Sequence, residues 1–130
     1  MKRIIFLLLL TMVILTGCSA ATVSPTVTKT PEASMKEFSS KIASQHYSEA
    51  YVYFSPDFQK KESLEHFITT LGPVMYECKT FASLGSYPSP LKNESPDSAQ
   101  LVYKTGSKVE DTIQLTLVKI NGEWKLNDFR

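Results

Sequence analysis

The fold is decided by one stretch, Ile113-Gln114-Leu115-Thr116-Leu117-Val118-Lys119-Ile120-Asn121-Gly122-Glu123-Trp124-Lys125-Leu126-Asn127-Asp128-Phe129-Arg130. Asn121-Gly122 stands between two runs in which apolar and polar residues alternate. This pattern predicts a β-hairpin, because both turn residues tolerate the positive φ that a type I′ turn requires. A two-residue turn also fixes the register, which is predicted to place Ile120 opposite Glu123, Leu117 opposite Leu126, Leu115 opposite Asp128 and Ile113 opposite Arg130.

The predicted register divides the side chains of the hairpin between two faces. One face is expected to line the core and gathers Ile113, Leu115, Leu117, Trp124 and Leu126. Asp128 falls on that face, so the register places a carboxylate among apolar side chains. The opposite face is mostly polar but carries Val118, Ile120 and Phe129. These three residues form a predicted docking face for a second copy of the chain or for another protein.

The sequence before the hairpin also predicts strands. Residues 74–87 are predicted to form one long strand or two short ones, with a bulge or bend at Gly85. Residues 88–97 are rich in proline and polar residues and are predicted to be a loop, and residues 105–108 a turn. Between them, a half-buried strand is predicted from the alternation of Ala99, Leu101 and Tyr103 with polar neighbours.

Helical patterns occupy the first half of the folded part. Ser34 and Glu37 have the spacing of a capping box, which predicts a helix start at Ser34. That helix is expected to bury Met35, Phe38 and Ile42. Ser48 is predicted to cap a second short helix that carries Ala50, Tyr51 and Phe54 and stops at Ser55-Pro56.

A third helix is predicted for residues 62–71, ending at Gly72-Pro73. Its apolar stripe would consist of Leu64, Phe67, Ile68 and Leu71, and His66 is expected to face water. Helices followed by strands indicate an α+β domain, in which N-terminal helices pack on one face of a curved antiparallel sheet that ends in the hairpin.

Two segments of this domain resemble a known family. They are His46-Tyr47-Ser48-Glu49-Ala50-Tyr51-Val52-Tyr53-Phe54-Ser55-Pro56-Asp57-Phe58 and Asn121-Gly122-Glu123-Trp124-Lys125-Leu126. Both are similar to segments of nuclear transport factor two-like domains, and the resemblance covers residues 35–130. It implies a cone with a pocket at its wide end. Some members are isomerases or cyclases with an acid and a base in that pocket, and many are non-catalytic envelope domains.

The first eighteen residues have the features of an export signal. Lys2 and Arg3 precede the apolar run 4–15, which is too short to span a bilayer comfortably. The run ends in Leu15-Thr16-Gly17-Cys18, which resembles the lipobox of bacterial lipoproteins. The resemblance implies that residues 1–17 are a signal peptide and that the thiol of Cys18 carries a diacylglycerol. The alternative is an ordinary secretory signal followed by an unmodified cysteine.

A lipid on Cys18 would fix the location of the protein. Two acyl chains bury enough methylene groups for lasting membrane attachment, whereas one chain binds reversibly. The expected location is therefore the extracytoplasmic face of the cell membrane, with outer and inner membranes not distinguished. Residues 18–34 are rich in Thr, Ser and Pro and are predicted to be the lipidated cysteine and a tether. The folded domain is expected to comprise residues 35–130.

Composition narrows the range of ligands. The formal net charge is +1, and loss of Lys2 and Arg3 would lower it to −1, so no basic excess predicts nucleic-acid binding. The two histidines and Cys78 lack metal-ligand spacing, and the glycines are scattered, so neither a metal nor a phosphate-binding cofactor is predicted. Cys78 is interpreted as a small buried hydrophobic residue, not a nucleophile.

Two functions from different classes fit these observations. The first is a lipid-anchored binding or assembly module of the cell envelope, whose partner would be an envelope protein, a second copy or a small apolar ligand. The second is a small isomerase, dehydratase or cyclase. Such an enzyme would need an acid and a base with pKa values moved toward neutrality, and the candidates are Asp128 and His46, with Tyr47 beside the histidine.

Overall fold

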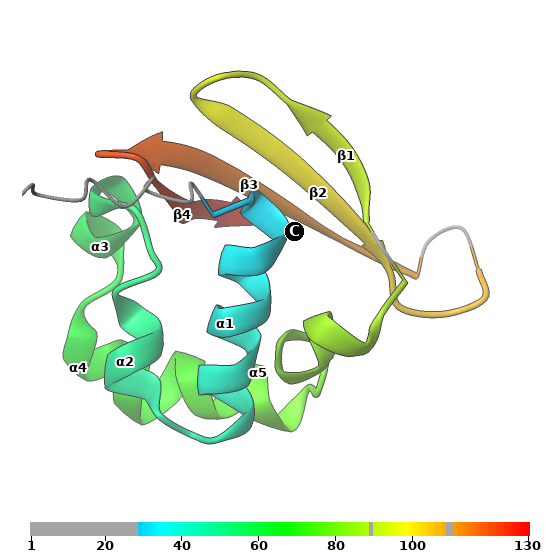
Figure 1. Cartoon of the computed structure of the whole chain (residues 1–130). Helices are drawn as coiled ribbons and strands as arrows, with labels where there is room; N and C mark the ends of the chain where they lie inside the picture. The colour runs from blue at the N-terminus through cyan, green and yellow to red at the C-terminus, as the bar shows by residue number, and fades with distance from the viewer. Residues whose placement is uncertain (1–28, 89, 109–110) are drawn as a thin grey trace, which may run out of the picture.

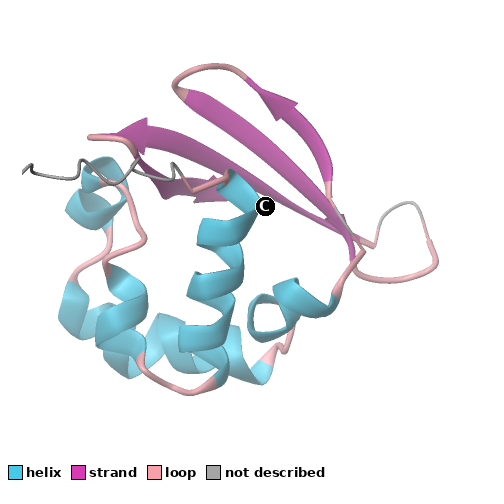
Figure 2. Ribbon diagram, in the orientation of Figure 1, coloured by secondary structure: helices cyan, strands magenta, loops and turns pink. Residues whose placement is uncertain are grey.

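The computed structural model describes residues 29–88, 90–108 and 111–130, and it has helices followed by a four-stranded antiparallel sheet (Figures 1 and 2). This arrangement confirms the predicted α+β class. The helical elements are α1 (Pro31–Ala43), α2 (Tyr47–Tyr51), α3 (Pro56–Lys61), α4 (Leu64–His66), the π-helix η1 (Phe67–Leu71), α5 (Gly72–Glu77) and the 3₁₀-helix η2 (Phe81–Ser86). The strands, in sheet order, are β1 (Leu91–Glu94), β2 (Ser98–Lys104), β3 (Thr112–Ile120) and β4 (Glu123–Phe129).

All the described helices lie on one side of the sheet, and α1 packs directly against it (Figure 1). Met35, Phe38 and Ile42 form the fully buried side of α1, as predicted. The sheet contributes the alternating residues that face this helix, and the resulting core includes Ala99, Leu101, Tyr103, Ile113, Leu115, Leu117, Trp124 and Leu126. The other face of the sheet is not covered by any described segment (Figure 1).

The predicted start of the first helix is wrong by three residues. Thr30 is the N-cap, and its hydroxyl accepts a hydrogen bond of 3.2 Å from the backbone N–H of Ala33. Pro31 follows at the first helical position, where its fixed φ favours the helix and its missing N–H costs no hydrogen bond. Ser34 is therefore inside α1 and buried, and the last part of the predicted tether is helical.

The segment around Ser55-Pro56 contains a helix that the sequence analysis missed. The predicted short helix exists as α2, and it ends before Phe54. Ser55 then caps α3 by accepting a hydrogen bond of 3.1 Å from the N–H of Phe58, with Pro56 at the first position. The Ser-Pro pair thus starts a helix as well as ending the preceding segment.

The prediction that Gly72-Pro73 ends the third helix is wrong, because the helix continues through η1 into α5. The N–H of Gly72 donates to the carbonyl of Phe67, five residues back, which gives the wider turn of a π-helix. In a regular α-helix the ring of Pro73 would clash with the carbonyl four residues earlier. The wider turn just before Pro73 is the local feature that accommodates this ring.

The π turn also changes which residues face the core. Phe67 is fully buried, whereas Leu64 and Ile68 of the predicted apolar stripe are 43% and 37% exposed. A π turn advances by less than 100° per residue, so a stripe predicted from α-helical spacing loses its alignment. His66 is exposed as predicted, and its Nδ1 lies 2.5 Å from a carboxylate oxygen of Glu62.

The strands predicted for residues 74–87 are wrong, because this segment forms α5 and η2. A turn at Lys79, which has φ 57°, separates the two helices. Met75 of α5 and Phe81 and Leu84 of η2 reach the core. Phe81 and Leu84 are three residues apart, and this spacing places two side chains on the same side of a 3₁₀-helix. Their apolar character therefore results from helical packing and not from packing in a strand.

The sheet also contains a strand that was predicted to be a loop. β1 lies within residues 88–97 and pairs antiparallel with β2, with Lys92 opposite Leu101 and Glu94 opposite Ala99. Strand β2 agrees with the prediction, since Ala99, Leu101 and Tyr103 are buried.

The C-terminal hairpin has the predicted turn and, near it, the predicted register. Asn121 and Gly122 have φ values of 52° and 82°, and Leu117 lies opposite Leu126. A β-bulge then shifts the pairing, so Thr116 lies opposite Asp128 and Leu115 opposite Phe129. The predicted pairs of Leu115 with Asp128 and of Ile113 with Arg130 are therefore wrong. Asn127 is the extra residue, and everything beyond it changes face.

The outer border of β4 is covered by the segment that joins α2 to α3. Phe54 forms a parallel bridge with Leu126. The N–H of Leu126 donates to the carbonyl of Tyr53 over 2.7 Å, and the N–H of Ser55 donates to the carbonyl of Leu126 over 2.9 Å. The strand therefore has hydrogen-bonded neighbours on both sides at this point.

Candidate functional site

The predicted lipidation site and its signal lie outside the described residues. Cys18, the apolar run 4–15 and the tether up to residue 28 all belong to that part of the chain. None of the helices in the described part is long and apolar enough to cross a membrane.

Asp128, the predicted catalytic carboxylate, does not face the core. The bulge at Asn127 turns Asp128 to the outer face of β4, where it is exposed and opposite Thr116. Its expected place beside Leu115 is taken by Phe129. Asp128 is therefore exposed to solvent and does not lie among the apolar side chains where the predicted register placed it.

His46, the second catalytic candidate, lies at the N-terminus of α2 and is not brought to Asp128. Its side chain is 58% exposed, and its Nδ1 lies 3.5 Å from the hydroxyl of Ser44 and 3.9 Å from a carboxylate oxygen of Glu49. Neither a hydrogen bond nor an ion pair joins His46 to Asp128 in the described part of the chain. Tyr47 packs on Gly72, and burial raises the pKa of its phenol further from neutrality.

The predicted docking face loses one of its three residues. The ring of Phe129 packs on the core side against Phe81 and Phe58, with centroid distances of 5.0 and 5.9 Å. The cause is again the bulge, which exchanges the faces of Asp128 and Phe129. Val118 and Ile120 stay on the outer face and are half-buried.

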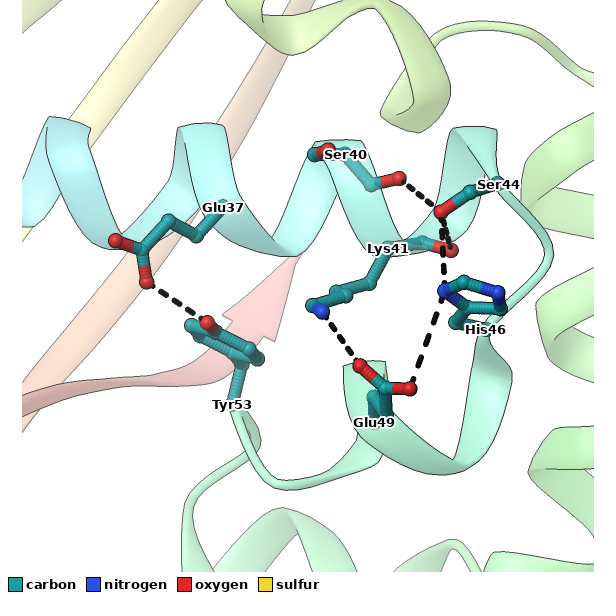
Figure 3. Close-up of polar contacts among 7 residues, drawn as sticks. All are labelled: Glu37, Ser40, Lys41, Ser44, His46, Glu49 and Tyr53. Carbon is teal, nitrogen blue, oxygen red and sulfur yellow. Dashed lines mark hydrogen bonds and ion pairs between the residues drawn. The ribbon is translucent and has the colours of Figure 1, made fainter.

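A cluster of polar side chains lies between α1, α2 and the segment that follows α2 (Figure 3). The hydroxyl of Tyr53 donates a hydrogen bond of 2.8 Å to a carboxylate oxygen of Glu37. Lys41 forms an ion pair of 2.5 Å with Glu49, whose other oxygen faces His46. These residues come from α1, α2 and the segment after α2, so their contacts join the helix that covers the sheet to the helices beside it.

The pKa values of Glu37, Glu49 and Tyr53 are displaced away from neutrality. Hydrogen bonds from Lys29 and then from Tyr53 lower the pKa of Glu37, and the hydrogen bond from Lys41 lowers that of Glu49. Burial, followed by the hydrogen bond to Glu37, raises the pKa of Tyr53 to about 12. At neutral pH both carboxylates stay ionised and the phenol stays protonated. The cluster is therefore suited to holding helices together and poorly suited to exchanging protons.

Cys78 is exposed, so the interpretation of this thiol as a buried hydrophobic residue is wrong. It follows the last residue of α5, where the helix turns away from the core. In the described residues, no three His, Cys, Asp or Glu side chains gather in a way that could hold a metal ion.

The helical side of the molecule carries exposed apolar side chains, two of which, Leu64 and Ile68, were predicted to face the core. They lie in or next to α2, α4, η1 and α5 and are Val52, Leu64, Ile68, Val74 and Tyr76. A pattern search could not have found them as a group, because the π turn at η1 decides which of them face solvent.

No protein-family model, no curated protein and no solved structure matches this chain.

Proposed function

We propose that this chain is a lipid-anchored, non-catalytic binding or assembly module of the bacterial cell envelope. One observation carries the proposal. Cys18 follows two small residues at the end of an apolar run that begins directly after Lys2 and Arg3. A positive start, an apolar run of this length and a small-small-Cys ending together define the substrate of lipoprotein processing.

The folded part is consistent with a head held near a membrane. Helix α1 begins at Pro31, so at most twelve residues separate Cys18 from the first residue of the helix. Even fully extended, such a length reaches only about 40 Å. A domain attached in this way stays within reach of other envelope components at the same membrane surface. We further infer that the domain is of the nuclear transport factor two-like kind, from the resemblance of residues 46–58 and 121–126.

The non-catalytic part of the proposal rests on the titratable groups. Asp128 and His46, which an acid–base enzyme of this kind would use, lie on different elements and both face solvent. Among the residues that the structure describes, the buried polar side chains are those of Ser34, Ser39 and Ser55, none of which titrates near neutral pH. A binding role requires no such group, and it favours the uncovered outer face of the sheet, where Val118 and Ile120 lie.

Mass spectrometry of the purified protein tests the anchor. The expected mature chain starts at Cys18 and carries the added mass of a diacylglycerol. A Cys18→Ser variant should lose both the lipid and the membrane fraction, whereas the matched Cys78→Ser variant should keep both. An unmodified Cys18, or residues 1–17 still attached, would overturn the proposal.

Cross-linking in intact cells tests the binding role. Val118→Lys and Ile120→Lys place charge on the outer face of the sheet and should reduce capture of specific envelope proteins. Thr70→Lys, an exposed change in η1 on the helical side of the molecule, is the control for a general effect of added positive charge. Recovery of every partner at the same level with all three variants would remove this face from the proposal.

A further inference from the structure

The described sheet has one border without a hydrogen-bonded neighbour. Strand β1 is at the end of the strand order and lies outermost in Figure 1. Its described backbone bonds join it only to β2, whereas β4 at the opposite border is bridged by Phe54. Lys92, Asn93 and Glu94 of this border strand are all exposed. Unpaired N–H and C=O groups along such an edge can bind another extended strand.

The charges on β1 are arranged symmetrically about Asn93, the third of its four residues. Lys92 and Glu94 flank Asn93 and lie opposite the buried residues Leu101 and Ala99, so both project toward the helical side of the sheet. Their side chains form an ion pair of 2.5 Å, and Lys92 also pairs with Glu32 of α1 over 3.2 Å. One positive and one negative group are thus held on the same side of the free edge, with a neutral amide between them.

We propose that β1 pairs antiparallel with β1 of a second copy of this chain, with Asn93 on the two-fold axis. In this register Lys92 of one copy lies opposite Glu94 of the other, and the same pair repeats on the far side of the axis. Residues directly opposite each other share a face, so both ion pairs form on the helical side of the joined sheets. The two Asn93 amides meet on the outer face.

The charge pattern selects both the partner and the register. If the two-fold axis passed through Lys92 or Glu94, two like charges would lie opposite each other. In a parallel, in-register pair, Lys92 would lie opposite Lys92 and Glu94 opposite Glu94. Like charges directly opposite each other destabilise a strand pair. Within one copy Lys92 and Glu94 pair with each other, and an unrelated strand need not present further opposite charges to them. A second copy presents both charges in the reversed order that antiparallel pairing needs.

The pairing is expected to be weak in dilute solution, because four residues form a small interface. Confinement of two copies to one membrane raises their effective concentration without adding contacts. This step rests on the proposed lipid anchor. The strand pairing itself depends only on the edge and its charges.

A cysteine at the two-fold axis provides a direct test. Full-length Asn93→Cys is made in a Cys78→Ser background and oxidised in its native membranes with copper phenanthroline and oxygen, which accept the two electrons and two protons of disulfide formation. Opposed residues in an antiparallel pair have Cα atoms about 4.5–5.5 Å apart, within the range of a disulfide. We expect a dimer with the disulfide mapped to position 93. The control, Ser107→Cys, is also exposed but lies between β2 and β3 and not on β1, and equal dimer yield for both would overturn the proposal.

Charge reversal tests the register. In the Asn93→Cys background, Lys92→Glu should reduce the dimer yield several-fold by opposing two carboxylates, and Glu94→Lys should do the same by opposing two ammonium groups. The combination of both changes restores opposite charges and should restore the yield. Thermal unfolding of each variant identifies any loss of fold. If the folded single variants gave the same dimer yield as Asn93→Cys alone, this register would be wrong.

Failure of the anchor can be distinguished from failure of the pairing. Mass spectrometry of the same samples reports the lipid on Cys18, independently of the disulfide at position 93. If Cys18 is unmodified, the oxidation is repeated on the purified chain at high concentration. Dimer formation there would support the strand pairing although the proposed function had failed, and its absence would reject the pairing as well.

Discussion

The hydroxyl of Ser55 donates a hydrogen bond of 2.6 Å to the side-chain oxygen of Asn127, although the two residues are 72 positions apart in the chain. Ser55 is fully buried, and Asn127 is the bulged residue of β4. A bulge that directs an amide toward a buried hydroxyl satisfies both groups without water. The same bulge turns Asp128 to solvent and Phe129 to the core. The hydrogen bond between Ser55 and Asn127 is thus located where the last residues of the hairpin exchange faces.

Ser55→Ala is expected to lower the free energy of unfolding by about 2 kcal/mol. The substitution removes the N-cap of α3 and leaves the oxygen of Asn127 without its buried donor. Ser63→Ala is the matched control, since Ser63 caps α4 by the same kind of bond but is exposed. It should cost about 1 kcal/mol or less. Equal losses in urea unfolding would show that the bond to Asn127 contributes nothing.

Phe129→Ala is expected to destabilise the fold and not merely to alter a surface. Its ring contacts Phe81 and Phe58, so its removal should cost about 2 kcal/mol, below the range for fully buried phenylalanines. Ile120→Ala, near the turn on the other face, should cost less than about 1 kcal/mol. Chemical denaturation of both variants gives the comparison, and a smaller effect at Phe129 than at Ile120 would mean that the bulge is absent in solution.

Gly72→Ala is expected to destabilise the protein although alanine is the better helix former. A Cβ at this position would lie 2.7 Å from Cδ1 of Tyr47 and 3.0 Å from the carbonyl oxygen of Phe67. In a Tyr47→Ala background the first clash disappears, so the same substitution should cost less there. A double-mutant cycle from unfolding free energies measures the difference. Additive effects would argue against close packing of Tyr47 on Gly72.

The ionisation of Tyr53 should respond to Glu37. Its pKa is raised from 10.0 to about 12, so the phenol contributes stability that is complete below pH 10 and is lost as pH rises toward 12. Glu37→Gln removes the carboxylate that accepts its hydrogen bond and should lower this pKa. Tyr103, whose pKa of about 12 arises mainly from burial, is the internal control. Site-resolved tyrosine titration by NMR checks both, and an unchanged Tyr53 would refute the contact with Glu37.

The sequence correctly predicted the elements whose conformation depends on residues close together in the chain. The turn at Asn121-Gly122 and the buried alternation of β2 depend on neighbouring residues and are correct. The start of α1 was misplaced because two capping patterns overlap, and Thr30-Pro31 acts before Ser34 can. The strands predicted for residues 74–87 failed because a π turn carries the helix past Gly72-Pro73.

The candidate site was harder to predict, because its residues are placed by contacts distant in sequence. The predicted register placed Asp128 in the core, and the β-bulge at Asn127 reverses this placement. The side chain of Asn127 is bonded to Ser55, which lies 72 positions earlier in the chain. The position of Phe129 follows from the same event. Strand β1 is short and charged and has no alternation of apolar and polar residues. Its own sequence therefore does not predict that it pairs with β2. The lipid on Cys18 remains a prediction from its motif.

The bridge between Phe54 and Leu126 has a further consequence for assembly. Within the described residues, β4 is bridged at Leu126 by the molecule's own backbone, and β1 is the border strand that has no such bridge. Growth through β1 would therefore terminate after two molecules, giving a discrete eight-stranded particle where a protein open at both ends would polymerise into a filament.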